Sequence, residues 1–135
     1  MTYPAKFEQA DDGITITFRD LTDAISAASS EDEAAHNAAE ALDLTLEARL
    51  EEGQDIPLPS AIEPGEVLIA PSAGTQAALL VHLARQQRTL SDLARTMGTS
   101  WAAVQRLENP KHSPSLRQLE RAAAALGKRL ILTFE

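Results

Sequence analysis

Residues 89–109, TLSDLARTMGTSWAAVQRLEN, constrain the fold more than any other part of the chain. Thr89 can cap the start of a short helix, because its side-chain oxygen can accept a hydrogen bond from the backbone of the first turn. Gly98 then allows a sharp turn, since glycine adopts the left-handed backbone conformation at low cost. Thr99 or Ser100 can cap the helix that follows. The spacing predicts two short helices joined by a tight turn, which is the pattern of a helix–turn–helix.

The second helix of such a pair is the one that enters the major groove of DNA. Val104 and Leu107 are three residues apart and should face the core, so the opposite side of the helix should face base edges. We expect Trp101 to be exposed on that side. The residues predicted to read bases are Ser100, Trp101, Ala102, Gln105 and Arg106, and those predicted to bind phosphates are Arg88, Arg95, Asn109 and Lys111. The alternative is an ordinary pair of core helices with no DNA partner.

Charge is divided unevenly along the chain. Residues 74–135 contain nine basic and four acidic side chains, a net charge of +5, whereas residues 1–73 contain three basic and 16 acidic ones, a net charge of −13. A basic half suits the phosphate backbone of DNA. An acidic half is repelled by phosphate and suits a cationic protein. The distribution predicts DNA binding in the C-terminal half and protein binding in the N-terminal half.

Length and composition allow one or two small domains in this chain of 135 residues. There is no cysteine, which excludes disulfides and cysteine-ligated metal sites. The sequence does not open with a basic segment followed by an apolar core, so no signal peptide is expected. The uncharged residues 67–84 are interrupted by proline, glycine and polar side chains, so no membrane span is expected. We expect a cytoplasmic protein with two domains, residues 1–71 and 72–135.

The N-terminal half has the pattern of a small α+β domain. Residues 3–8 and 14–18 predict a β-hairpin, since Ile14, Ile16 and Phe18 alternate with polar residues after an Asp-Gly step. The elements that follow are a weak strand at 24–28, a helix that begins at a Ser30–Glu33 capping box and has Ala35, Ala38, Ala39, Leu42 and Leu46 on one face, and a strand at 66–70. The predicted order is β-β-β-α-β.

The C-terminal half predicts an all-α module that ends in a strand. One helix over residues 76–87 precedes the helix–turn–helix, and another from Ser115 to Leu126, ended by Gly127, follows it. The tail has strand composition but no neighbour in sequence to pair with. We expect it to pair with its own copy in a homodimer or a higher even oligomer, because a lone strand leaves its backbone groups unpaired. The residues predicted to join the copies are Leu130, Leu132 and Phe134.

Several segments together resemble the HicB family of antitoxins from type II toxin–antitoxin systems. They are Tyr3-Pro4, the hairpin, the helix start at Ser30, the segment IPLPS at residues 56–60 and the repressor-like module. The resemblance implies an N-terminal domain with a degenerate ribonuclease-H-like fold that binds a small basic toxin, HicA, which cleaves mRNA. It also implies that the C-terminal module, similar to Cro/C1-type repressors, binds the operon's own promoter. Residues 21–28 depart from the family's usual Pro/Gly-containing third strand.

We therefore expect an antitoxin that neutralises a HicA-type toxin and represses its own operon on double-stranded promoter DNA, with no catalytic activity, cofactor or metal. The alternative is a phage-like transcriptional regulator whose N-terminal domain senses another partner. A nuclease is a more distant alternative, because nothing in the sequence brings the carboxylates to one point as a magnesium site requires. The carboxylates concerned are Asp11, Asp12, Asp20, Asp23 and Glu33. The three histidines, His36, His82 and His112, lack metal-ligand spacing and are interpreted as surface residues.

Acidic side chains on the N-terminal helix are the candidates for toxin binding. Their spacing of three or four residues predicts one solvent-facing stripe, opposite Ala35, Leu42 and Leu46. The candidates are Glu40, Asp43, Glu47 and Glu51 on the helix, with Asp11 and Asp12 at the hairpin tip. The alternative is that this stripe only keeps the domain soluble and that strand edges make the contacts.

Overall fold

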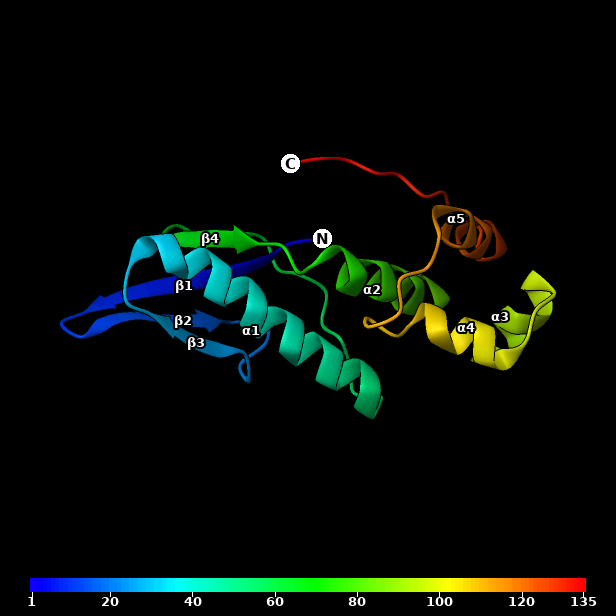
Figure 1. Ribbon diagram of the computed structural model, residues 1–135, viewed down its shortest axis with the longest axis horizontal. Helices are drawn as coiled ribbons and strands as arrows, with labels where there is room; N and C mark the ends of the chain where they lie inside the picture. The colour runs from blue at the N-terminus through cyan, green and yellow to red at the C-terminus, as the bar shows by residue number, and fades with distance from the viewer. The chain divides into compact units, whose positions relative to one another are not determined.

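The computed structural model describes residues 1–135 (Figure 1). The chain divides into two compact units, Met1–Ser72 and Ala73–Glu135, and each unit has its own fold. The first contains all the strands and one long helix, and the second contains four shorter helices. The protein is therefore a mixed α/β chain with its strands confined to the N-terminal unit.

The N-terminal unit is built on a four-stranded antiparallel sheet. Its strands lie in the order β3-β2-β1-β4, so the first hairpin forms the centre and β3 and β4 form the edges. The strands are β1 (Tyr3–Ala10), β2 (Gly13–Phe18), β3 (Ile25–Ala28) and β4 (Glu66–Ile69). With the long helix between β3 and β4, they confirm the predicted β-β-β-α-β order.

The β1–β2 hairpin closes through Asp11 and Asp12, because Ala10 pairs with Gly13. Gly13 has a φ of +141°, a conformation that residues with a side chain rarely adopt. A Cβ atom at this position would lie 2.7 Å from the backbone oxygen of Ala28 in β3. Glycine here therefore serves both the turn and the close approach of the edge strand.

Helix α1 (Glu31–Glu52) packs against the sheet and completes the core of the N-terminal unit. Ala34, Ala38, Leu42 and Leu46 are its buried residues. The prediction that Ala35 faces the core is wrong, because the buried positions recur every four residues and leave Ala35 exposed. The buried strand residues are Tyr3, Pro4, Ala5, Ile14, Ile16, Phe18, Ala28 and Ile69.

The start of α1 differs from the predicted capping box. Ser30 has the extended backbone of an N-cap, but its side chain makes no capping hydrogen bond. Glu33 Oε2 instead accepts a hydrogen bond from the backbone N–H of Ser29, at 3.3 Å. The three acidic residues of the first turn still interact favourably with the positive end of the helix dipole.

The C-terminal unit is a cluster of four helices around a small aliphatic core. The helices are α2 (Ala73–Arg85), α3 (Leu90–Met97), α4 (Trp101–Leu107) and α5 (Leu116–Ala125). The core is formed by Val81, Leu93, Ala94, Val104, Leu107, Ala122 and Leu126. Helix α2 begins three residues earlier than the predicted start at residue 76.

Local side-chain chemistry explains where α3 and α4 begin and end. Thr89 and Asp92 form a reciprocal capping box at the start of α3. Gly98 ends α3 with a φ of +66°, in the left-handed region. Of the two candidate caps for α4, Ser100 is the one that acts, since its side chain accepts from the backbone N–H of Ala103.

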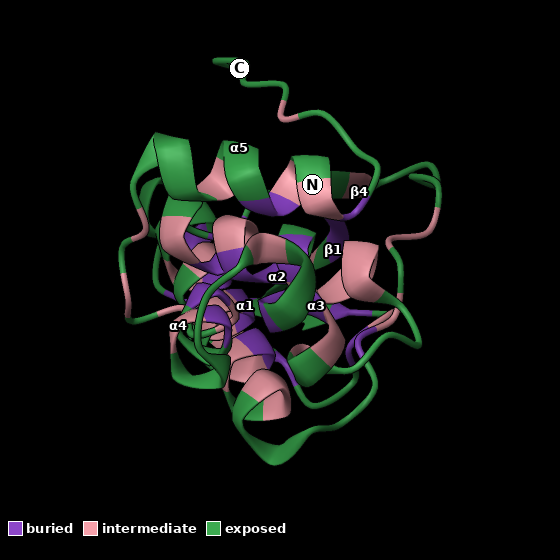
Figure 2. Cartoon of the chain, turned by 90° about the vertical axis from the view of Figure 1, so that its right-hand side faces the viewer, coloured by how far each residue is buried: buried purple, intermediate pink, exposed green.

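In the single chain the tail after α5 forms no strand, and its predicted pairing with a second copy stays a prediction. Ile131, Leu132 and Phe134 are exposed, and Figure 2 shows the tail as a green, solvent-exposed segment. The physical reason is that a strand needs the backbone of another strand beside it, and residues 128–135 pair with none in the single chain.

Candidate functional site

The acidic stripe predicted on α1 is only partly exposed. Glu40 and Glu51 are exposed, whereas Asp43 and Glu47 are half-buried. Asp43 Oδ1 accepts a hydrogen bond from the backbone N–H of Ser72 at 2.8 Å, so this carboxylate has a structural partner. Of the four helical candidates, Glu40 and Glu51 are therefore the two whose side chains are exposed to a partner.

The hairpin tip lies at the other end of the helix from most of these acids. Gln9 Nε2 lies 3.4 Å from Glu31 Oε1, which places the strand next to the tip against the start of α1. Asp11 and Asp12 are both exposed there. Glu51 is 20 residues further along α1, about 30 Å at the α-helical rise. The six candidate toxin-binding acids therefore do not form one site.

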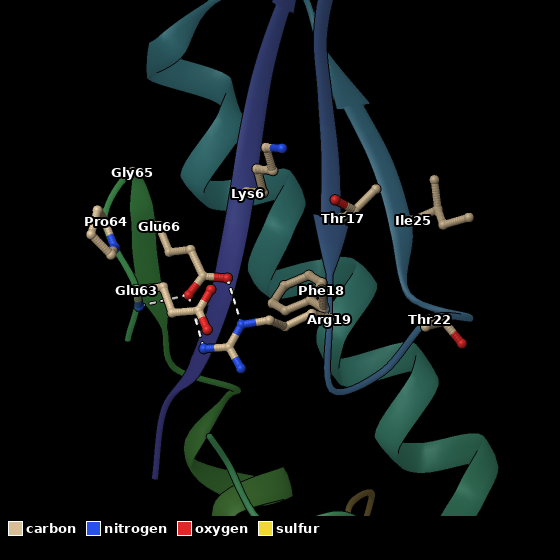
Figure 3. A pocket seen from close by; sticks show the side chains of 10 residues that line it. All are labelled: Lys6, Thr17, Phe18, Arg19, Thr22, Ile25, Glu63, Pro64, Gly65 and Glu66. Atoms are coloured by element: carbon tan, nitrogen blue, oxygen red, sulfur yellow. Dashed lines mark hydrogen bonds and ion pairs between the residues drawn. The ribbon is translucent and has the colours of Figure 1, made fainter. Parts of the chain in front are cut away.

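The outer face of the sheet, on the side away from α1, contains a hollow of about 550 Å³ (Figure 3). The register of the strands places Glu66, Lys6, Thr17 and Ile25 in one row across all four strands. Arg19, Glu63 and Glu66 lie close together on the β4 side of the hollow. Charges of both signs and apolar side chains thus line this hollow.

Arg19, which follows β2, is hydrogen-bonded to Glu66, the first residue of β4. Its Nε donates to Glu66 Oε2 at 2.8 Å, and its Nη2 donates to Glu66 Oε1 at 3.0 Å and to the backbone oxygen of Ala61. The hydrogen bond from Arg19 is the main reason why the pKa of the Glu66 carboxyl is below its usual range. Sequence reasoning missed this pair, because its members are 47 positions apart and follow no helical or strand spacing.

The segment IPLPS is held to the sheet by two buried or half-buried polar side chains. The Tyr3 hydroxyl donates to the backbone oxygen of Pro57 at 2.8 Å. Asp20 accepts from the backbone N–H of Ser60 at 2.8 Å and also from its hydroxyl. Burial raises the pKa of Tyr3 to about 12, with a further contribution from the charge of Asp20. These contacts give the segment a structural role in positioning the loop before β4.

The α3–α4 pair places the predicted base-reading residues on one exposed surface. Val104 and Leu107 are buried, whereas all five predicted base-reading residues are exposed. Trp101 is 49 % exposed, so its side chain is available to a partner, as predicted. Ser100 already uses its side-chain oxygen as the cap of α4.

The predicted phosphate-binding residues also make contacts within the chain. Arg88 Nη1 donates to the backbone oxygen of Ala125 at 3.2 Å. Arg95 Nη1 lies 3.4 Å from Asp92 Oδ1, and Asn109 Oδ1 accepts from the backbone N–H of Lys111. All four side chains are exposed, so these contacts do not remove them from a partner's reach.

Glu108 is a functional candidate that the sequence did not reveal. It caps the C-terminal end of α4, with Arg85 Nε at 2.6 Å from Oε2 and His82 Nδ1 at 2.8 Å from Oε1. The interpretation of His82 as a surface residue is wrong, since its side chain is half-buried against this carboxylate. Burial alone would raise the pKa of Glu108, but the hydrogen bonds from His82 and Arg85 outweigh it and lower that pKa.

No three histidine, aspartate or glutamate side chains converge closely enough to hold a metal ion. None of the helices combines the length and the apolar composition needed to cross a membrane. The candidate site residues lie on two surfaces. The N-terminal unit has an acidic surface that includes the hollow on its sheet, and the C-terminal unit has the exposed side of α4.

Residues 2–79 match the family model described as "HicB_like antitoxin of bacterial toxin-antitoxin system". The chain is 30 % identical over 132 residues to "Antitoxin HicB 2" of Photorhabdus laumondii, an alignment that covers 98 % of this chain and 95 % of the relative. It is 27 % identical to "Antitoxin HicB 1" of the same organism, over 100 % of this chain and 88 % of that relative. It is 29 % identical to "Antitoxin HicB" of Escherichia coli K12, over 99 % of both chains.

Proposed function

The chain belongs to the HicB-like antitoxin family, and on that premise we propose that it binds and neutralises a small basic HicA-type toxin that cleaves mRNA. We propose further that it represses its own operon by binding promoter DNA. It acts by binding in the cytoplasm, without chemistry of its own. The observation that carries the proposal is that the family match, residues 2–79, covers residues 2–72 of the acidic N-terminal unit.

Charge supports a toxin partner for the N-terminal unit. A toxin that grips RNA presents a cationic surface, and an acidic protein can occupy that surface in place of the phosphates. Residues 1–73 carry a net charge of −13, and only Lys6, Arg19 and Arg49 oppose it. All three bases are paired internally, Lys6 with Glu8, Arg19 with Glu66 and Arg49 with Asp23.

The exposed helical surface supports DNA binding by the C-terminal unit. A helix–turn–helix presents the outer side of its second helix to the major groove, and α4 has an apolar inner side and an exposed outer side in the C-terminal unit. Arg106 is the member of the exposed group that can make a bidentate contact with guanine. Arg88, Arg95, Asn109 and Lys111 are the proposed phosphate ligands.

A dimer follows from the proposed DNA contact. One helix–turn–helix reads a half-site, so two recognition helices about one turn of DNA apart are required for a specific operator. The exposed apolar residues of the tail, Leu132 and Phe134 with the half-buried Leu130, are the proposed means of joining two copies.

The assignment of neutralisation to the N-terminal unit is tested by expressing residues 1–73 alone together with a HicA-type toxin encoded next to the gene of this protein. Survival of the cells is expected, because neutralisation is assigned to the acidic unit. Circular dichroism of the purified fragment establishes that it folds. Death of the cells despite a folded fragment would contradict the proposal, as neutralisation would then require the C-terminal unit.

The second candidate function is a phage-like regulator whose N-terminal unit senses a partner other than a toxin. The observation that favours it is that the family model ends at residue 79 and leaves most of the C-terminal unit outside it, although the HicB relatives align with 98 % or more of the chain. Co-purification separates the two. A HicA-type toxin retained by the tagged full chain supports the antitoxin, and specific promoter binding without any such toxin supports the regulator.

A further inference from the structure

The edge strand β3 has a hollow on each side. The hollow of about 550 Å³ lies on the outer face of the sheet, and another of about 450 Å³ lies between β3 and α1. Ile25 lines both of them, because it begins the strand that separates them. We call this surface, formed by β3 and the two hollows, the β3-edge surface.

Main-chain groups of β3 are directed outward at this edge. Residues in an antiparallel pair alternate between those that bond to the neighbouring strand and those whose N–H and C=O face away from it. Asn37 Nδ2 donates to the backbone oxygen of Ala27 at 2.9 Å, so Ala27 faces away from β2. Ile25 is two residues earlier and shares that orientation. Asn37 thus occupies the backbone oxygen of Ala27. The backbone N–H and C=O of Ile25 are also directed to the open edge of the sheet.

Two large apolar side chains are exposed beside β3, Leu44 at the groove between β3 and α1 and Ile25 on the outer face opposite Thr17. Ile25 is 64 % exposed and Leu44 is 62 % exposed, and both line the groove. Protein interfaces place apolar residues at the centre and polar residues at the rim. Asp23 and Glu40 line the same groove and provide such a rim.

The charge of the groove selects a cationic partner. No lysine, arginine or histidine lines it. The basic side chains that reach its acids come from outside the groove: Arg49 Nη2 lies 2.7 Å from Asp23 Oδ1, and His36 Nε2 lies 3.6 Å from Glu40 Oε2. A second copy of this chain would bring acids against acids, which is unfavourable.

We propose that the toxin adds a strand to β3 and places its side chains alternately in the two hollows. Successive side chains of a strand point to opposite faces, so an added strand reaches both hollows at once. On one face of the added strand, basic and apolar side chains enter the groove beside α1, where they meet its acids and Leu44. On the other face, apolar side chains enter the outer hollow and cover Ile25. This inference rests on the proposed function, because it assumes a basic toxin as the partner.

The test compares two double variants of the full chain that change its charge equally. I25K/L44K places two cations on the β3-edge surface. L58K/L68K places two cations at exposed apolar residues of the same unit that line neither hollow. Calorimetric titration with the HicA-type toxin encoded beside this chain measures the dissociation constant of each. I25K/L44K is expected to weaken binding by at least about tenfold, since truncating a central contact has that effect, whereas L58K/L68K stays near the wild type.

Hydrogen exchange of the wild-type chain gives an independent readout. Protection of the Ile25 amide on adding toxin is expected, and circular dichroism establishes that both variants are folded. If the wild-type chain and I25K/L44K bind the toxin with equal affinity and the Ile25 amide gains no protection, this proposal is overturned while the proposed function stands. Absence of binding by the wild-type chain would overturn both. A lower mass of I25K/L44K in light scattering without toxin would also overturn the proposal, because β3 would then join two copies of the chain.

Discussion

Arg85 Nε lies 2.6 Å from Glu108 Oε2, and this ion pair ties the end of α4 to α2. Both side chains are largely buried, and His82 from α2 shares the same carboxylate. Since α4 carries the proposed base-reading residues, the pair fixes the helix on which DNA recognition depends. The pair therefore links the stability of the C-terminal unit to its proposed function.

Replacing Glu108 with glutamine should destabilise the C-terminal unit by about 1–3 kcal/mol, the cost of leaving buried polar groups without a proper partner. The folded pKa of Glu108 is below its ordinary 4.5, so its contribution to stability is full above that value and is lost as the pH falls through the lowered pKa. Thermal unfolding at pH 7 and at decreasing pH measures both effects. The control is Glu120→Gln, since Glu120 is exposed. An equal melting temperature for Glu108→Gln and the wild type would contradict this role.

Gly13→Ala should destabilise the N-terminal unit more than Gly65→Ala. Both glycines have a positive φ, so both substitutions introduce backbone strain of about 1–3 kcal/mol. Only at Gly13 would the new Cβ meet the backbone oxygen of Ala28, at 2.7 Å, whereas nothing lies within 4 Å at Gly65. Urea titration of the two variants measures the difference, and equal midpoints would show that β3 moves aside without cost.

Local patterns account for what could be predicted from the sequence. Ile14, Ile16 and Phe18 alternate along β2, and Thr89 and Gly98 mark the ends of α3 by chemistry that acts within a few residues. Ala35 was misplaced because a run of alanines gives several almost equivalent apolar faces, and only packing on the sheet selects one.

Contacts between distant residues could not be predicted in the same way. Arg85 and Glu108 are 23 positions apart, and Arg19 and Glu66 are 47 positions apart, so no periodicity connects the partners. The two hollows beside β3 depend on the strand order and on the helix that follows. For Ile25, sequence patterns indicated a weak strand but could not indicate an exposed edge.

Arg106→Ala should weaken promoter binding by about 1–3 kcal/mol and relax specificity at one base pair, as loss of a bidentate contact with guanine does. The control is Arg117→Ala, which removes the same charge from an exposed position on α5. A gel-shift titration at fixed salt compares the two variants with the wild type. Equal losses for both would attribute the effect to net charge, and no loss for Arg106→Ala would show that α4 does not read bases.

Leu132→Asp should dissociate the proposed dimer, whereas Ile131→Asp should leave it intact. Leu130, Leu132 and Phe134 would share one face of a strand formed between two copies, and Ile131 would lie on the other face. In the single chain the two positions are equally accessible, with Ile131 70 % and Leu132 63 % exposed, so neither change is expected to disturb the monomer. Light scattering measures the mass, and the gel shift measures operator affinity, which should fall with the dimer. A dimeric mass for both variants would exclude the tail as the interface, and a monomeric mass for both would show that no single strand face joins the copies.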